Sequence, residues 1–431
     1  PLRSDLFFYG RSDLLHEICA KLAVGENFGL FGLRRSGKTS IVIGLNRTIK
    51  SRGGASVVID CQNPSVHQRR WNDLLYYIVS QVKETFCVSV KLLNEDQYDE
   101  KNAADSFLSD MKLLKARMKV DFLAILFDEI ERISFGTASS SHWNDERDFL
   151  LFWQSIRFGF QQGRSPFTFL IVGTNPSAIE HQKIFESDNP LFGNVEKRFI
   201  PMFDQSQINE MIDELGSIMG IHFDQHTKSK IGEDFGGHPF LTRYACSYIA
   251  KVTEKRPAEI DRTIYGLGID KFSSESNSYV DSVVGLLREQ YPDEFELLKH
   301  LALKDFIFFD GYSKAEPRLL EHIMGYGLIE QGAKTHYFKV GVVENYFKNL
   351  AKPTISMSAK ARKSEVSERR NTIEGLLRSK IAQVIKIVHS KNKRRDKVIA
   401  KVTPSRKQLL DGKSFEEILS VDQSPLYFNE L

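Results

Sequence analysis

The segment that most constrains the fold of this chain is Gly32-Leu-Arg-Arg-Ser-Gly37-Lys38-Thr39, which matches G-x-x-x-x-G-K-[ST] at every fixed position. It follows the apolar run Asn27–Phe31 and precedes a helical pattern over Thr39–Arg52. Glycines allow such a turn to wrap a phosphate with backbone N–H groups pointing inward, and a helix N-terminus adds positive potential. The segment therefore predicts a phosphate-binding loop between a strand and a helix.

The residue types in this loop predict ATP or ADP with Mg²⁺ as its ligand. Lys38 would contact the β- and γ-phosphates, and the hydroxyl of Thr39 would ligate Mg²⁺. The other loop residues expected to contact the nucleotide are Gly32, Arg35, Ser36, Gly37 and Ser40. A chance glycine-rich turn is the alternative, and the flanking strand and helix disfavour it.

A second polar feature follows the buried run Phe122–Phe127, which leads into Asp128 and Glu129. At such a strand end, one carboxylate can hold Mg²⁺ through water and the next can activate the attacking water. We therefore expect Asp128 to be the metal-binding residue and Glu129 to be the general base. An acidic pair that merely ends a strand is common, so this assignment depends on the phosphate loop beside it.

A third polar pair, Thr174 and Asn175, follows the apolar run Thr168–Gly173. Polar groups at this strand end can contact the γ-phosphate and the attacking water, so Asn175 is expected to be catalytic. A plain strand-to-loop turn is the alternative. Arg198 is a candidate arginine finger that would reach the γ-phosphate of a neighbouring subunit, and an ordinary surface arginine is the alternative.

Apolar runs alternate with helical patterns through the first 200 residues, which favours an α/β fold with a parallel sheet covered by helices on both faces. The expected strands are Asn27–Phe31, Ser56–Asp60, Phe122–Phe127, Thr168–Gly173 and Phe199–Met202. The expected helices of this part are Thr39–Arg52, Asn72–Phe86, Ala104–Met118 and Glu146–Gly163.

The remainder of the chain is predicted to be mainly helical. Helical spacing extends over Gln207–Met219, Pro239–Val252 and Thr372–Val388, and a strand is expected at Thr335–Val340 after two or three helices. The predicted units are an ATPase core (1–205), a helical lid (206–275), a winged helix (276–352), a linker (353–370) and a basic helical domain (371–431).

Composition and charge exclude some classes of protein. The chain is 41% hydrophobic, and no apolar run reaches the roughly 18 residues that a membrane span needs. No signal-peptide pattern is visible and the four cysteines include no CxxC pair, so a cytoplasmic protein without membrane contact is expected. Residues 356–431 hold 17 Lys and Arg against 9 Asp and Glu, so nucleic acid is a candidate partner for this tail, with a solvated charged face as the alternative.

Taken together, these motifs resemble the AAA+-related STAND ATPases. The resemblance is strongest to the branch named for its abundance in archaea, whose nucleotide module is similar to that of the origin-recognition ATPases. It covers about residues 6–250. The segments that carry it are Phe8-Tyr9-Gly10-Arg11, GLRRSGKTS, DEIERI, IVGTN and Gly236-Gly-His238-Pro239.

The resemblance implies roles for residues outside the phosphate loop. Tyr9, Gly10 and Arg11 would lie near the adenine, and His238 and Pro239 would contact the nucleotide from the lid. From the residues alone, His-Pro after two glycines indicates only a rigid helix start, so a helix N-cap is the alternative. Arg243, about one helical turn further on, is a candidate second sensor.

The resemblance also implies a switch ATPase, in which ATP binding and slow hydrolysis control homo-oligomerisation or an effector or sensor protein, as in prokaryotic stress and antiphage systems. The alternative is a DNA-binding loader or remodeller similar to the origin-recognition ATPases. Between Ser278 and Leu350 acidic and basic residues are nearly balanced, which favours protein over DNA as the partner of the winged helix. A P-loop kinase is disfavoured by the acidic pair and the helical lid.

Overall fold

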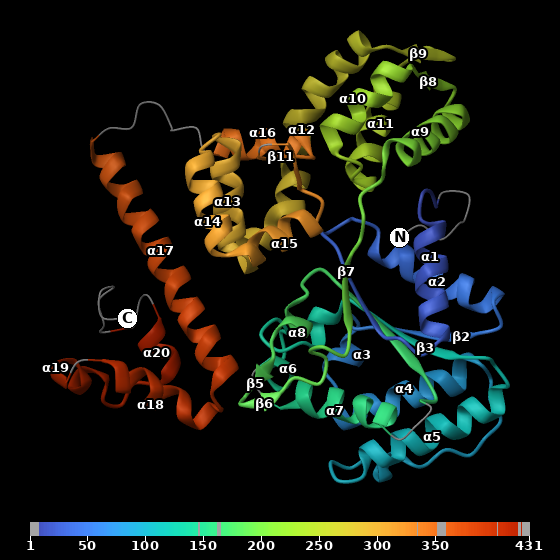
Figure 1. Cartoon of the computed structure of the whole chain (residues 1–431), viewed down its shortest axis with the longest axis vertical. Coiled ribbons are helices and arrows are strands. Elements are labelled where there is room, and N and C mark those ends of the chain that lie inside the picture. Colours follow the sequence, from blue (N-terminus) through green and yellow to red (C-terminus); the bar gives the residue numbers. More distant parts are fainter. Residues whose placement is uncertain are drawn as a thin grey trace.

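The computed structural model describes residues 8–144, 147–161, 165–333, 335–350, 359–402, 404–420 and 424. Figure 1 shows an α/β part that carries the N-terminus, a second, mostly helical part packed above it, and a long C-terminal helix running alongside both.

A five-stranded parallel sheet forms the core of the first part, as the sequence predicts. Its spatial order is β2-β3-β4-β1-β7. Because all the strands are parallel, the carboxyl ends of the neighbours β3, β4 and β1 lie at the same edge of the sheet. This order places the phosphate loop, which follows β1, next to the polar residues that follow β4. The strands are β1 (Phe28–Phe31), β2 (Ala55–Asp60), β3 (Leu123–Asp128), β4 (Thr168–Gly173) and β7 (Glu196–Phe199).

Helices cover both faces of this sheet (Figure 1), and β3 shows why. Ala124 and Leu126 pack with α1 (Ser12–Ala23) and α2 (Lys38–Ser51), whereas Ile125 and Phe127 pack on the other face, because successive strand residues point to opposite sides. The helices of that other face are α4 (Trp71–Thr85), α5 (Ala103–Met118) and α7 (Asp148–Gln161). The short elements are α3 (Pro64–His67), η2 (Glu95–Gln97), η3 (Ile130–Ile133), α6 (Ser141–Asn144), α8 (Ser177–Glu180), β5 (Lys183–Ile184) and β6 (Ser187–Asp188).

The last strand of the sheet begins earlier than predicted: β7 spans Glu196–Phe199, and the prediction of Phe199–Met202 is wrong. Among the described residues β7 pairs only with β1, so it is an edge strand and tolerates charged side chains. The apolar residues that suggested a strand serve other purposes. Ile200 packs in the core beneath α1 and α2, and Phe203 belongs to the core of the second part.

Residues 205–350 form the second part, which we call the helical unit. A single hydrophobic cluster runs through it from Ile208 to Phe347. The elements are α9 (Gln205–Met219), β8 (Ile221–Phe223), α10 (Gln225–Phe235), α11 (Pro239–Val252), β9 (Ala258–Ile260), α12 (Arg262–Gln290), α13 (Pro292–Ala302), α14 (Phe306–Ala315), α15 (Pro317–Gly325), β10 (Ile329–Gln331), β11 (His336–Phe338) and α16 (Gly341–Leu350).

Two features of the helical unit bear on the predicted domains. The helix α12 continues through residues 275 and 276, where the sequence suggested a boundary between lid and winged helix. The antiparallel hairpin β10–β11 follows three helices, and its second strand lies within the predicted Thr335–Val340. The assignment of this region as a winged helix stays a prediction.

The C-terminal part has its own small core, made by residues such as Val398, Leu410 and Ile418. Its first helix begins at Ala359, inside the predicted linker and well before the predicted start at Thr372, because residues 359–370 are rich in helix-forming Ala, Lys, Arg and Glu. Residues 353–358 lie outside the described residues. The elements are α17 (Ala359–Val388), α18 (Lys391–Lys401), α19 (Pro404–Lys407), η4 (Gln408–Leu410) and α20 (Phe415–Leu419). Within the described part of the chain, no helix has the length and apolarity to cross a membrane.

A buried histidine joins the α/β part to the helical unit. The Nε2 atom of His322 lies 2.9 Å from Glu180 Oε1 on α8, and its Nδ1 lies 2.9 Å from Glu294 Oε1 on α13. Burial alone would lower the pKa of His322, but its hydrogen bonds to the two carboxylates outweigh that effect and raise the pKa to about 9. The imidazolium therefore links the two parts at neutral pH.

This histidine predicts a pH dependence of stability. Its folded-state pKa is above the unfolded value of about 6.5, so the stabilisation is fully present below pH 6.5 and is lost as pH rises through about 9. We expect the free energy of unfolding to fall by about 2–3 kcal/mol over this window. Chemical denaturation at pH 6 and pH 9.5 measures the change. His322→Gln should abolish most of this pH-dependent fall in the free energy of unfolding, whereas replacing the exposed His222 should leave it unchanged. An equal fall in the two variants would show that His322 is not its cause.

Candidate nucleotide-binding site

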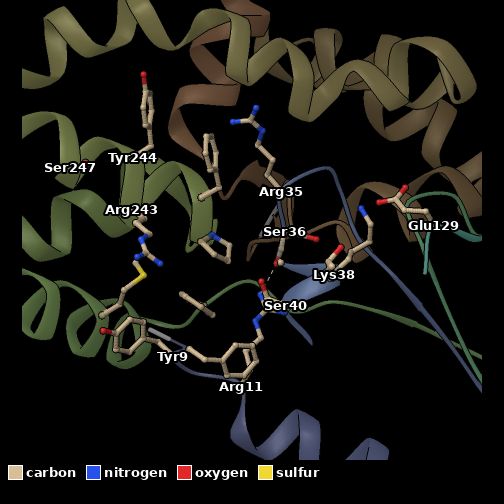
Figure 2. Close-up of a pocket in the computed structure, with 17 residues that line it drawn as sticks. Tyr9, Arg11, Arg35, Ser36, Lys38, Ser40, Glu129, Arg243, Tyr244 and Ser247 are labelled. Carbon is tan, nitrogen blue, oxygen red and sulfur yellow. Dashed lines mark hydrogen bonds between the residues drawn. The ribbon is translucent and has the colours of Figure 1, made fainter. Parts of the chain in front are cut away.

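A pocket of about 610 Å³ lies between the α/β part and the helical unit. Figure 2 shows Lys38 and Glu129 at one end of this pocket and Tyr9 and Arg243 at the other. The residues that line it are Phe8, Tyr9, Arg11, Arg35, Ser36, Gly37, Lys38, Thr39, Ser40, Glu129, Phe203, Met211, Pro239, Phe240, Arg243, Tyr244 and Ser247.

The phosphate loop has the geometry that its sequence predicts. Gly37 adopts φ 96°, a conformation that favours glycine, and Lys38 is the first residue of α2. The N-terminal N–H groups of α2 therefore face the pocket. The Nζ of Lys38 donates to the backbone oxygen of Gly32 at 3.2 Å and to Thr174 Oγ1 at 2.9 Å. The lysine thus connects the loop after β1 with the turn after β4.

Arg11 lies against this loop. Its Nη2 donates to the backbone oxygens of Ser36 at 3.3 Å and Pro201 at 3.1 Å, and burial lowers the pKa of its guanidinium to about 10. Arg11 Nη1 and Ser36 Oγ are buried and have no hydrogen-bond partner among the described residues. Buried polar atoms are rarely left unpaired, so these two atoms fit a polar ligand beside the loop. The guanidinium of Arg11 lies beside the phosphate loop and over the ring of Phe203, and the contact with adenine that the resemblance implies stays a prediction.

The pocket also has an apolar wall. Tyr9 and Phe203 come from the segments that flank the sheet, and Met211, Phe240 and Tyr244 come from α9 and α11. Aromatic and apolar side chains of this kind suit the face of a purine ring. The wall therefore fits the base of a nucleotide whose phosphates reach Lys38.

Gly10 supports this wall without lining the pocket itself. It adopts φ 62°, and its backbone oxygen accepts from Gln207 Nε2 of α9 at 2.8 Å. A Cβ atom at this position would lie 2.9 Å from Gln207 Cβ. Close backbone contact with α9 therefore requires a glycine here, next to Tyr9.

The residues predicted to bind the metal are brought together. The carboxylate of Asp128, at the end of β3, is hydrogen-bonded to the hydroxyl of Thr39. Burial raises the pKa of Asp128, and the Thr39 hydrogen bond opposes that rise. A buried carboxylate beside a hydroxyl at the phosphate loop is a set of oxygen donors that suits Mg²⁺.

Glu129 lines the pocket next to Asp128 and adopts a left-handed backbone conformation with φ 54°. This conformation is uncommon for a residue other than glycine and is concentrated at functional sites. The backbone N–H of Glu129 donates to Asp128 Oδ1 at 3.0 Å. This bond ties the carboxylate of Asp128 to the backbone of Glu129, and Glu129 lines the ligand space.

Sequence reasoning missed Glu131. Its Oε1 accepts from the backbone N–H groups of Thr174 and Asn175, the latter at 2.7 Å, and burial raises the pKa of its carboxyl. Glu131 thereby fixes the turn after β4. The signal available in the sequence was the third acidic residue in Asp-Glu-Ile-Glu131.

Asn175 is turned away from the nucleotide pocket. Its Nδ2 donates to Gln290 Oε1, and its Oδ1 accepts from the hydroxyl of Tyr291 at 2.5 Å and from the N–H of Ser177 at 2.8 Å. It lines a second cavity of about 760 Å³ between the α/β part, the helical unit and α17. The structure thus brings Thr174 to Lys38 and gives Asn175 other partners, and a catalytic role for Asn175 stays a prediction.

The two lid residues lie differently. Pro239 lines the pocket, but His238 is fully buried outside the lining and its Nδ1 accepts from the N–H of Leu241 at 3.3 Å. It is the N-cap of α11, and burial is the main cause that lowers its pKa to about 4. The structure therefore shows the helix cap that was the alternative interpretation. A contact between His238 and nucleotide stays a prediction.

Arg198 lies on the edge strand β7, outside the pocket lining. It forms ion pairs with Glu17 at 2.5 Å and Glu196 at 2.7 Å, and its guanidinium lies over the ring of Phe28. These contacts account for Arg198 within its own chain. A role as an arginine finger in a neighbouring subunit stays a prediction.

Comparison with known proteins gives a likeness of fold. No family profile and no curated protein sequence matches this chain. The solved structure of the Walker-type ATPase PABY2304 of Pyrococcus abyssi aligns with a TM-score of 0.54 and 16% identity, over 81% of this chain and 98% of that one. RuvB of Thermotoga maritima, a Holliday junction branch migration motor, aligns with a TM-score of 0.40 and 13% identity, over 82% and 98% of the two chains. The alignment with PABY2304 shows that this chain shares the fold of that Walker-type ATPase.

Proposed function

We propose that this chain is an ATP-hydrolysing switch of the STAND type, whose bound nucleotide controls homo-oligomerisation or a partner effector. One observation carries the proposal: both parts of the chain line the same pocket. The α/β part contributes Lys38 and Glu129, and α11 of the helical unit contributes Phe240 and Arg243. A ligand that binds one arrangement of the two units more tightly than another shifts the equilibrium toward the arrangement that it prefers.

The residues present fit the reaction of ATP and water to ADP and phosphate. Lys38 and the N-terminus of α2 bind the phosphates. Thr39 and Asp128, which are hydrogen-bonded to each other, would hold Mg²⁺, and the bound ion would supply positive charge against the phosphate oxygens. Glu129 accepts a proton from the attacking water.

The hairpin β10–β11 supports a protein partner over DNA. Lys339 is ion-paired with Glu330 at 2.5 Å, and the other oxygen of that carboxylate accepts from the hydroxyl of Tyr337 at 2.9 Å. The lysine charge is therefore compensated within the hairpin, whereas DNA-binding proteins present a basic stripe. The biological setting of a stress or antiphage response rests on the sequence resemblance alone.

The test is the mass of Glu129→Gln in solution with ATP and Mg²⁺, compared with the same variant in ADP and with Lys38→Ala in ATP. Light scattering should show a larger species only for Glu129→Gln with ATP. An unchanged mass in every condition would contradict control of homo-oligomerisation. Co-elution of a partner protein would then test effector control, and salt-dependent retention on DNA would favour the loader alternative.

A further inference from the structure

The turn that follows β4 is held by the helical unit through two tyrosines. The hydroxyl of Tyr326, which follows α15, donates to the backbone oxygen of Thr174 at 2.7 Å. The hydroxyl of Tyr291, between α12 and α13, donates to Asn175 Oδ1 at 2.5 Å. Gln290 at the end of α12 accepts from the amide of Asn175. These contacts reach the turn from residues more than 100 positions away in the sequence.

The two tyrosine rings are packed, so their hydroxyls have little freedom. The ring of Tyr291 contacts that of His322 with centroids 4.5 Å apart, and the ring of Tyr326 contacts that of Phe199 with centroids 5.0 Å apart. Tyr326 is 1% exposed. Hydrogen bonds in such an environment are stronger than in water, and breaking one leaves a polar group without a partner.

The same turn is held by the nucleotide site from the other side. Lys38 Nζ donates to Thr174 Oγ1, and Glu131 Oε1 accepts from both backbone N–H groups of the turn. Because Lys38 also lines the nucleotide pocket, a phosphate that attracts its ammonium competes with Thr174 for it. The turn is thus the structural element that the nucleotide site and the helical unit share.

The side chain of Asn175 has no acceptor capacity left in this arrangement. Its Oδ1 accepts two hydrogen bonds, from Tyr291 and from the N–H of Ser177, and a carbonyl oxygen has two lone pairs. The carboxamide faces the second cavity, which Gln290 and Tyr291 also line. In this state it cannot orient a water molecule in the nucleotide pocket.

We propose that Gln290 and Tyr291 form a latch that holds Asn175 away from the nucleotide and thereby restrains hydrolysis. When the helical unit releases the latch, the carboxamide of Asn175 becomes available to the γ-phosphate and the attacking water. Tyr291 is a positioning residue that acts through Asn175. This inference rests on the proposed ATPase function and adds a regulation of the same site.

The test is steady-state ATP hydrolysis by the full chain with Tyr291→Phe, which removes only the hydroxyl. We expect kcat to rise about three- to tenfold, the range that loss of one hydrogen bond allows, while KM for ATP stays unchanged. Gln290→Ala removes the other partner and should have the same effect. In Asn175→Ala the substitution of Tyr291 should change nothing, because the group that the latch restrains is absent.

Tyr265→Phe is the matched control, since it removes a buried hydroxyl of the helical unit that donates to Asp234 at 2.8 Å, away from the turn. A similar rise in this control, or a rise that persists in Asn175→Ala, would overturn the latch. So would an unchanged or lower kcat in both latch variants. Hydrolysis that is lost in Lys38→Ala but unchanged in both latch variants would overturn the latch and leave the proposed function intact. No hydrolysis in wild type or in either latch variant would overturn both.

Discussion

Lys38→Ala is expected to weaken ATP binding by at least about 100-fold, because it removes the cationic group nearest the predicted phosphates from a largely buried position. The ammonium donates to the backbone oxygens of Gly32 and Leu33 and to the hydroxyl of Thr174. We expect the phosphates to bind next to these acceptors. Isothermal titration with ATP and Mg²⁺ measures the loss. The α2 helix itself should remain, since alanine favours helix.

The control for this prediction lies on the same helix. Lys50 is exposed near the end of α2, away from the pocket, so Lys50→Ala should bind ATP like the wild type. An affinity of Lys38→Ala within about threefold of wild type would show that the loop does not bind the phosphates, and would remove the basis of the proposed function.

Glu129→Gln should bind ATP and lose hydrolysis by a factor of about 10²–10⁴, the contribution usual for a general base. Glutamine has the shape of glutamate but cannot accept the proton of the attacking water. Asp128 and Thr39 remain in place to hold Mg²⁺, so affinity should change little. Single-turnover hydrolysis and a binding titration on the same preparation separate the two effects.

Glu84→Gln supplies the matched substitution at an exposed position on α4 and should hydrolyse ATP at the wild-type rate. If Glu129→Gln also hydrolyses like the wild type, Glu129 is not the base. The other acidic residues at this edge include Asp60, which pairs with Asp128 across β2 and β3, and Glu131, which is already bonded to the turn after β4.

Local patterns predicted the sheet well where strands are buried on both faces. β3 and β4 were found from unbroken apolar runs, because a central parallel strand packs against helices on each side. The edge strand β7 was misplaced because it pairs with only one of the described strands and carries charged residues, so it has no apolar run to reveal it. The start of α17 was missed because its first residues have helical propensity without an apolar stripe to reveal it.

The nucleotide site divides in the same way. The phosphate loop and the Asp128-Glu129 pair are continuous segments whose chemistry is set by neighbours in sequence, so the amino-acid sequence by itself determined them. Arg11 beside the loop, and Glu131 and Tyr291 around Asn175, are contacts between distant segments. Folding of the α/β part decided the contacts of Arg11 and Glu131, and packing of the helical unit on the sheet decided that of Tyr291. Side chains 116 residues apart, as Asn175 and Tyr291 are, leave no local pattern that shows they meet.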